Sequence, residues 1–263
     1  MSRFHHLEFT GATETAAQVV EQATLPASEV DCLATADRAF RAGDFEQALR
    51  HYARVLEEDA RCAPAWVGQA QMLIELGEPG EARLWAEKGL EQLPEEGSLL
   101  AAKAVAVARL GDREAGRVWS DNAMESPGEA PYLWLARGEV LLARREKPSD
   151  YCLDRAIALG GGDWLWPWLA SRALAFHDRF GQGLQRAQLA LTLASGEAVV
   201  WAQLAVCQAG MGLIGHAEHS LAQARELNPR CPEGERVQRL LRDGTGWSRW
   251  LGRLRHWAKG PHP

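Results

Sequence analysis

Residues Ala198–Cys231 read AVVWAQLAVCQAGMGLIGHAEHSLAQARELNPRC, and this stretch of 34 residues sets the pattern for the rest of the chain. Trp and Leu stand early in it, Gly212 near its middle, small residues after the glycine, and Pro229 near its end. Apolar and small residues at helical spacing on both sides of a glycine indicate two helices joined by a turn. The stretch therefore predicts one helix-turn-helix unit.

The same spacing recurs in several residue types. The glycines of the series are separated by 34, 34 and 101 residues: Gly43, Gly77, Gly111 and Gly212. The tryptophans are separated by 68 and 67 residues: Trp66, Trp134 and Trp201. Both series fall one residue short of the period at their last step. A single deletion between Trp134 and Trp201 explains both, and a fixed period of this length predicts a repeat protein.

This pattern resembles the tetratricopeptide repeat family. The residues that carry the resemblance in the last unit are Trp201, Leu204, Ala205, Gly212, Ala217, Leu221, Ala224 and Pro229. The resemblance implies an all-α fold, a right-handed α-solenoid of helix pairs in which each pair buries its apolar face against its neighbours. We expect six repeats at residues 29–62, 63–96, 97–130, 131–163, 164–197 and 198–231. An N-terminal extension (1–28), a capping helix (232–243) and a tail (244–263) complete the expected organisation.

Composition agrees with an elongated helical protein. The chain has 263 residues, 46% of them hydrophobic, and a formal net charge of −6. This charge disfavours a nucleic-acid-binding surface along the repeats. Five cysteines without CxxC spacing indicate free thiols, and we find neither an apolar signal segment nor an 18-residue apolar run. We expect a cytoplasmic protein.

The family resemblance also implies where a partner would bind, because first helices line the concave face of the solenoid. Its inward positions here are mostly small or apolar. The fifth positions are Leu33, Val67, Ala101, Leu135, Trp168 and Ala202, and the ninth positions are Asp37, Gln71, Val105, Glu139, Arg172 and Val206. Such a groove would suit a partner helix or extended segment with apolar anchors. Tight superhelical packing explains the small residues equally well.

Two tryptophan-containing features have alternative interpretations. Trp85 and Trp119 are 34 residues apart, and they either cover their neighbours on the outer wall or form an exposed pair that binds a partner. Gly160–Trp168 combines three glycines with Asp163, a candidate N-cap, and with Pro167, which fits a first helical turn. The phosphate-binding GxxxxGK[ST] pattern is missing there, so this stretch predicts a helix start rather than a nucleotide site.

Enzyme chemistry finds little support in the sequence. His216, Glu218 and His219 lack both the HExxH spacing and an identifiable third ligand. No Ser-centred elbow or paired Cys and His stands at a recognisable spacing. We therefore expect no catalytic residue, no cofactor, no metal site and no small-molecule substrate.

The tail is the strongest local pattern outside the repeats. From Arg230 to the end, seven Arg and one Lys stand against three acidic residues, a local net charge of +5. One helical face would carry Trp247, Trp250, Leu251, Leu254 and Trp257, and Arg253 lies on the other. This pattern is typical of a membrane-surface anchor, of a partner-binding tail, or of a terminal helix docked on the last repeat.

The sequence therefore predicts a non-catalytic adaptor that binds a protein partner in its concave groove. The alternative is an assembly protein held at the inner face of a membrane by its tail, with the repeats as spacer or oligomerisation unit. No nucleic-acid partner is expected.

Overall fold

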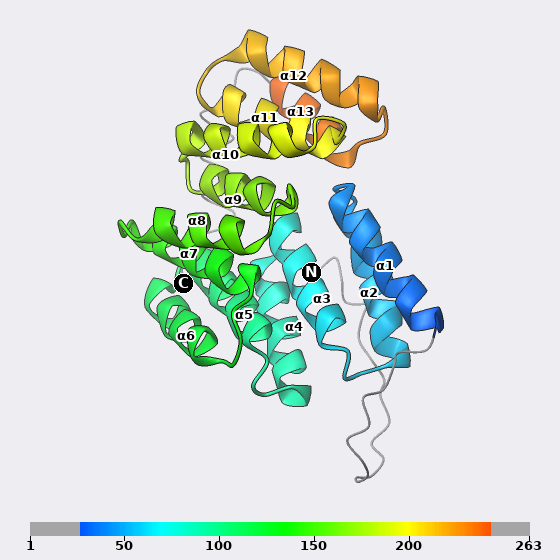
Figure 1. The fold of residues 1–263 in the computed structure, drawn as a ribbon, viewed down its shortest axis with the longest axis vertical. Coiled ribbons are helices and arrows are strands. Elements are labelled where there is room, and N and C mark those ends of the chain that lie inside the picture. The colour runs from blue at the N-terminus through cyan, green and yellow to red at the C-terminus, as the bar shows by residue number, and fades with distance from the viewer. Residues whose placement is uncertain (1–26, 243–263) are drawn as a thin grey trace, which may run out of the picture.

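The structure, a computed structural model, describes residues 27–242, which form thirteen α-helices and no strand (Figure 1). The helices are α1 (Ala27–Arg41), α2 (Phe45–Glu58), α3 (Ala63–Leu76), α4 (Pro79–Gln92), α5 (Gly97–Arg109), α6 (Arg113–Glu125), α7 (Pro131–Arg144), α8 (Ser149–Leu159), α9 (Leu165–Phe176), α10 (Phe180–Leu193), α11 (Ala198–Gly210), α12 (Ile214–Leu227) and α13 (Pro232–Arg242). The all-α repeat fold expected from the sequence is confirmed.

The helices stack as six successive pairs, α1/α2 to α11/α12, followed by the single helix α13. Each second helix packs on the first helix of the next pair, and from α3 onward the first helices pack on one another. This arrangement gives each pair a neighbour that covers its apolar side. Among residues 27–242, no helix is both long and apolar enough to cross a lipid bilayer.

Left-handed residues end the first helix of every pair. Gly77 shows why: its φ is +81°, and its N–H donates to the carbonyls of Ile74 and Leu73, which closes α3. The other glycines of the period share this conformation, but Arg145 and Asp178, with φ of +60° and +61°, take the same place after α7 and α9. The sequence series missed them because neither residue is glycine.

The deletion in the period lies between Arg145 and Ser149. Arg145 is 34 residues after Gly111, so the period is intact up to that point. The buried residues of α8 lie 34 residues before the buried residues of α10, so the period is intact again from Ser149: Ser149, Leu153 and Ala156 correspond to Gly183, Ala187 and Ala190. The turn between α7 and α8 therefore absorbs the missing residue.

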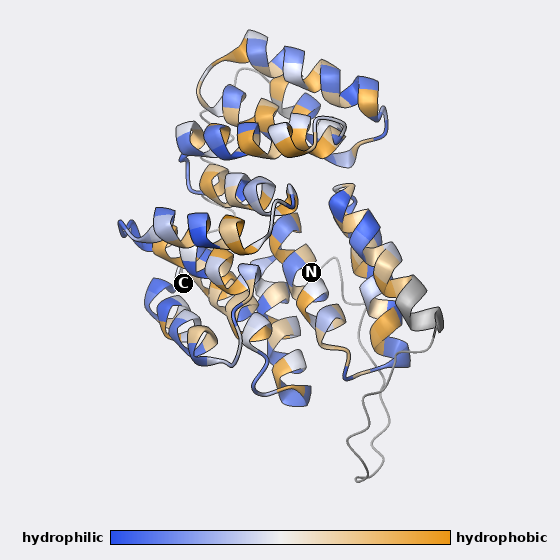
Figure 2. Cartoon of the chain, in the orientation of Figure 1, coloured by the Kyte–Doolittle hydropathy of each residue, from blue (hydrophilic) through white to orange (hydrophobic). Residues whose placement is uncertain are grey.

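The core follows the stack. One continuous cluster of buried apolar residues extends from α1 to the start of α11, and a second one joins α11, α12 and α13. Figure 2 shows hydrophilic residues along α6 and α12, at the outer edges of the stack. Val237 of α13 is 1% exposed and belongs to the second cluster, so α13 covers the apolar side of the last pair.

The stack curves until its first pair reaches its last. Figure 1 shows the end of α1 pointing toward α11 and α13. A Cβ atom placed on Gly43, in the turn after α1, would lie 2.8 Å from Val199 of α11 and 3.1 Å from Glu233 of α13. The solenoid therefore closes on itself, which the sequence pattern did not predict.

Candidate partner-binding face

The predicted groove residues all lie on first helices, but the structure divides them by exposure. Six are buried: Ala101, Val105, Leu135, Glu139, Trp168 and Ala202. Five are half-buried, namely Leu33, Val67, Gln71, Arg172 and Val206, and Asp37 is exposed. A partner reaches the first group only if the chain rearranges. The face is thus not one open groove along six repeats.

The turn after α1 covers part of this face. We call residues 40–45, with the sequence Phe-Arg-Ala-Gly-Asp-Phe, the closing turn. The rings of Phe40 and Phe45 lie 6.1 and 6.3 Å from the ring of Trp168, which has no exposed surface. These tilted aromatic contacts bury one of the predicted partner-binding residues against the first pair.

An ion pair fixes the closing turn beside α9. The two terminal nitrogens of Arg41 donate to the two carboxylate oxygens of Asp163 at 2.9 and 2.6 Å. Asp163 also accepts from the Leu165 N–H at 3.0 Å, which caps the start of α9. The hydrogen bond from Arg41 lowers the pKa of Asp163 below its usual range. Asp163 therefore lies at the start of α9, one residue before Trp164, which holds the N-cap position expected for Asp163, and it also binds the first pair.

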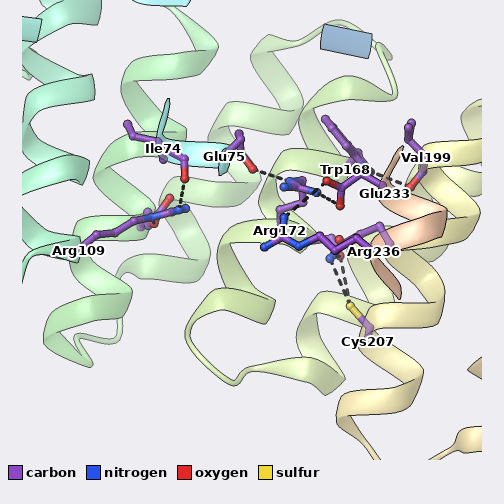
Figure 3. Close-up of polar contacts among 12 residues, drawn as sticks. Ile74, Glu75, Arg109, Trp168, Arg172, Val199, Cys207, Glu233 and Arg236 are labelled. Carbon is purple, nitrogen blue, oxygen red and sulfur yellow. Dashed lines mark hydrogen bonds and ion pairs between the residues drawn. The ribbon is translucent and has the colours of Figure 1, made fainter. Parts of the chain in front are cut away.

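Arg172 lies at the centre of the closed face. Its guanidinium donates to Glu75 of α3 at 2.5 Å and to Glu233 of α13 at 3.0 Å (Figure 3). It also lies over the rings of Phe45 and Trp168, 4.9 and 5.0 Å from their centroids. Burial alone would lower the pKa of Arg172, but the two carboxylates raise it above its usual range. We call Asp163, Trp168, Arg172, Val199 and Glu233 the seat of the closing turn.

A second buried ion pair joins α5 and α7. Arg109 donates to Glu139 at 2.6 Å and to the carbonyl of Ile74 at 2.8 Å, and it lies 4.1 Å from the ring centroid of Phe176. Burial would raise the pKa of Glu139, but Arg109 and His177 together outweigh it and the pKa falls to about 2. The carboxylate of the predicted groove residue Glu139 is therefore already paired with an arginine of the same chain.

Predicted groove residues stay accessible on α1 and α3, and Val206 of α11 is half-buried as well. Leu33 and Val67 occupy the same position in neighbouring repeats, and so do Asp37 and Gln71. Asp37 accepts a hydrogen bond from the Tyr52 hydroxyl at 2.7 Å, which holds its carboxylate in place. We call these four residues the open part of the inner face. They combine two apolar side chains with two polar ones on the first helices of neighbouring pairs.

Sequence reasoning found the charged residues at the ninth positions but missed three others on the inner face. Arg41, Glu75 and Arg109 are spaced by 34 residues, so charges of alternating sign occupy one position in three successive repeats. All three make ion pairs across the face. The sequence did contain a signal for these ion pairs, because charged residues recur at one inward position of a lining that is otherwise mostly apolar. Their partners on α7, on α9 and in the turn before α9 could not be read from the period.

The two expectations about tryptophans have different outcomes. Trp85 is 4% exposed and packs on Trp66 with ring centroids 5.6 Å apart, so the exposed-pair interpretation is wrong for Trp85. Trp119 is half-buried beneath the Lys103 ammonium, which lies 3.7 Å from its ring centroid. The tail residues Trp247, Trp250, Leu251, Arg253, Leu254 and Trp257 lie outside the residues that the structure describes.

Comparisons with known proteins agree with the helix-pair architecture. The family model described as "Tetratricopeptide repeat" matches residues 33–97. A tetratricopeptide repeat protein from Parabacteroides merdae is 14% identical, with 82% of this chain and 85% of that chain covered and a TM-score of 0.51. A thermophilic protein of the same kind from Thermus thermophilus is 20% identical, with 69% and 99% covered and a TM-score of 0.50. No curated protein matches the chain.

Proposed function

Because the chain is a tetratricopeptide repeat protein, we propose that it is a non-catalytic scaffold that binds a segment of a partner protein on the open part of its inner face. Tetratricopeptide repeats serve in general as protein–protein interaction scaffolds, because their stacked pairs create extended concave surfaces. What we add to this general role is the place on the chain where a segment of the partner binds.

The observation that carries the proposal is the placement of Leu33 and Val67 beside Asp37 and Gln71. Two half-buried apolar side chains at equivalent places on α1 and α3 offer anchor points about one repeat apart. The neighbouring carboxylate and amide provide hydrogen-bonding groups that fix a partner's register. A helix or extended segment with two apolar anchors and a basic or polar flank fits this surface.

A pair of matched variants tests the proposal. Val67→Glu places a charge on the open part of the inner face, and Leu84→Glu places the same charge on the outer helix α4, where Leu84 is 44% exposed. Each variant and the unchanged protein are used to capture proteins from native cytosol for mass spectrometry, after circular dichroism has shown equal helicity. We expect Val67→Glu to lose proteins that Leu84→Glu keeps. The same set of proteins with both variants would refute the proposed site.

A second candidate function follows from the basic, Trp-faced pattern of residues 247–257. In this alternative the protein is cytoplasmic and peripheral to the inner face of a membrane, and the repeats space or assemble its partners. Flotation with anionic and zwitterionic vesicles tests it. Loss of binding on removal of residues 244–263 would support the alternative, and absence of binding by the whole chain to anionic vesicles would reject it.

A further inference from the structure

We propose that the seat of the closing turn is a second binding site, for a partner segment that presents an arginine and a glycine between two aromatic side chains. In this structure the closing turn occupies the seat in cis and acts as a competing internal ligand. The site is separate from the open part of the inner face, so its test does not depend on the function proposed above.

The contacts of the closing turn define the chemistry that the seat recognises. Trp168 packs against two phenyl rings, and Asp163 binds a guanidinium through both oxygens. A bidentate pair of this kind selects arginine over lysine, because the planar fork of the guanidinium matches the two carboxylate oxygens. The recognised pattern is therefore aromatic, arginine, any residue, glycine, any residue, aromatic.

The glycine of this pattern is required by geometry. Gly43 has a φ of +75°, which L side chains rarely adopt, and a Cβ atom there would lie 2.8 Å from Val199. Only a glycine lets the backbone pass so close to α11 and α13. This requirement separates the proposed ligand from other segments that merely contain aromatic residues.

The seat is held together without the closing turn. Arg172 is fixed by Glu75 and Glu233, and neither belongs to the first pair. The indole nitrogen of Trp168 donates to the carbonyl of Val199 at 3.2 Å. Asp163 keeps its hydrogen bond from the Leu165 N–H. Because these groups position one another, the seat is preorganised for a ligand supplied by another molecule.

The contact between the closing turn and the seat can open and let another segment bind. The Arg41 and Asp163 side chains are 40% and 31% exposed, so water competes for their ion pair. A tethered ligand acts at an effective concentration on the order of millimolar, so an external segment binds in proportion to the fraction of molecules whose seat is free. Weakening the cis contact without changing the seat must therefore raise the apparent affinity for such a segment.

The experiment uses the full chain and a fluorescent peptide with the sequence of residues 38–47. Fluorescence anisotropy compares its binding to the unchanged protein, to Arg41→Ala, and to Arg41→Ala combined with Asp163→Asn. We expect Arg41→Ala to bind the peptide about 5-fold more tightly than the unchanged protein, and Asp163→Asn to reverse that gain. Asparagine retains the ability to cap α9, so the second change tests the charge. A peptide with both phenylalanines replaced by alanine is the control.

Hydrogen exchange of the closing turn shows whether the seat has been vacated. If Arg41→Ala leaves that exchange unchanged, Phe40→Ala is added, because Phe45 belongs to the buried side of α2 and is kept. Faster exchange of the turn without peptide binding would overturn the proposal. The proposal would also be overturned if the turn stayed protected and no peptide bound in the variant that combines Arg41→Ala with Phe40→Ala. The closing turn would then be a fixed part of the hydrophobic core. Equal binding of the control peptide would also overturn the proposal. So would a doubled mass by light scattering, because the seat would then bind a second copy of the chain.

Discussion

At the scale of single residues, glycines mark places where helices approach closely. A Cβ atom on Gly68 of α3 would lie 2.5 Å from the ring of Tyr52, which is 3% exposed and cannot move away freely. We expect Gly68→Ala to lower the free energy of unfolding by about 1–3 kcal/mol, because the overlap forces α2 and α3 apart. Urea unfolding followed by circular dichroism measures the change.

Gly181 of α10 provides the matched control. A Cβ atom there would meet no atom within 4 Å. Gly181→Ala should therefore leave stability unchanged or raise it by up to about 1 kcal/mol, since alanine has the higher helix propensity. Equal losses at both positions would show that propensity or an unfolded-state effect, rather than the contact with Tyr52, determines the outcome.

The buried pair of Glu139 and Arg109 predicts a pH dependence. The pKa of Glu139 is about 2, compared with an ordinary value of 4.5, so the folded protein holds the charged form more strongly than the unfolded chain does. This contribution to stability is complete above the ordinary pKa and is lost as the pH falls from about 4.5 toward about 2. Acid unfolding should therefore steepen across that range.

Glu139→Gln isolates the contribution of this carboxylate. At pH 7 the variant leaves Arg109 buried without its charge partner, and we expect a loss of about 3 kcal/mol. At pH 3 the difference between the two proteins should be smaller, because unfolding of the unchanged protein is then favoured by proton uptake. Urea unfolding at both pH values measures it. The exposed Glu218→Gln is the control, and a gap that stays constant with pH would contradict the assignment.

At the scale of elements, the turns set how consecutive helices meet. Arg145 ends α7 at a φ of +60°, where a side chain costs about 1 kcal/mol relative to glycine. Arg145→Gly should therefore raise the free energy of unfolding by up to about 1 kcal/mol, as measured by urea unfolding. Arg179→Gly is the control, because Arg179 has a φ of −92° and glycine gains nothing there. A gain of the same size in both variants would rule out relief of backbone strain.

The turn between α7 and α8 also explains where the period of the sequence failed. Glycine marks this position in four of the pairs, whereas Arg145 and Asp178 adopt the same left-handed conformation without it. Conformation is therefore more regular than residue type along this chain. A search by glycine alone could count the repeats but could not locate two of their turns.

At the scale of the whole molecule, the closing turn links the first pair to α9, α11 and α13. Trp168 is the buried centre of that link, and Trp168→Ala removes the ring against which Phe40 and Phe45 pack. We expect a loss of about 3–5 kcal/mol in stability and a larger radius of gyration by small-angle X-ray scattering. The expansion is expected because the first pair then lacks its aromatic contact with the fifth pair.

Trp201→Ala is the matched control at this scale. Trp201 is half-buried at the start of α11, and its indole nitrogen donates to the carbonyl of Ser195, away from the closing turn. This variant should lose stability without expanding the molecule. An unchanged radius of gyration in Trp168→Ala would mean that other contacts are sufficient to close the solenoid.

Four features follow from the sequence alone: the period, the helix pairs, the position of most turns and the helix after residue 231. These features depend on contacts between residues fewer than 40 positions apart, so a local pattern records them. It also identified Asp163 as the start of a helix, because a capping residue acts on its own neighbours.

The accessibility of the inner face, in contrast, depends on contacts between distant repeats. Arg41 and Asp163 are 122 residues apart, and they meet because small rotations between successive pairs add up until the first pair reaches the fifth. No single repeat encodes that sum. The ninth position therefore forms ion pairs across the face at Glu139 and Arg172, but it stays accessible at Asp37 and Gln71.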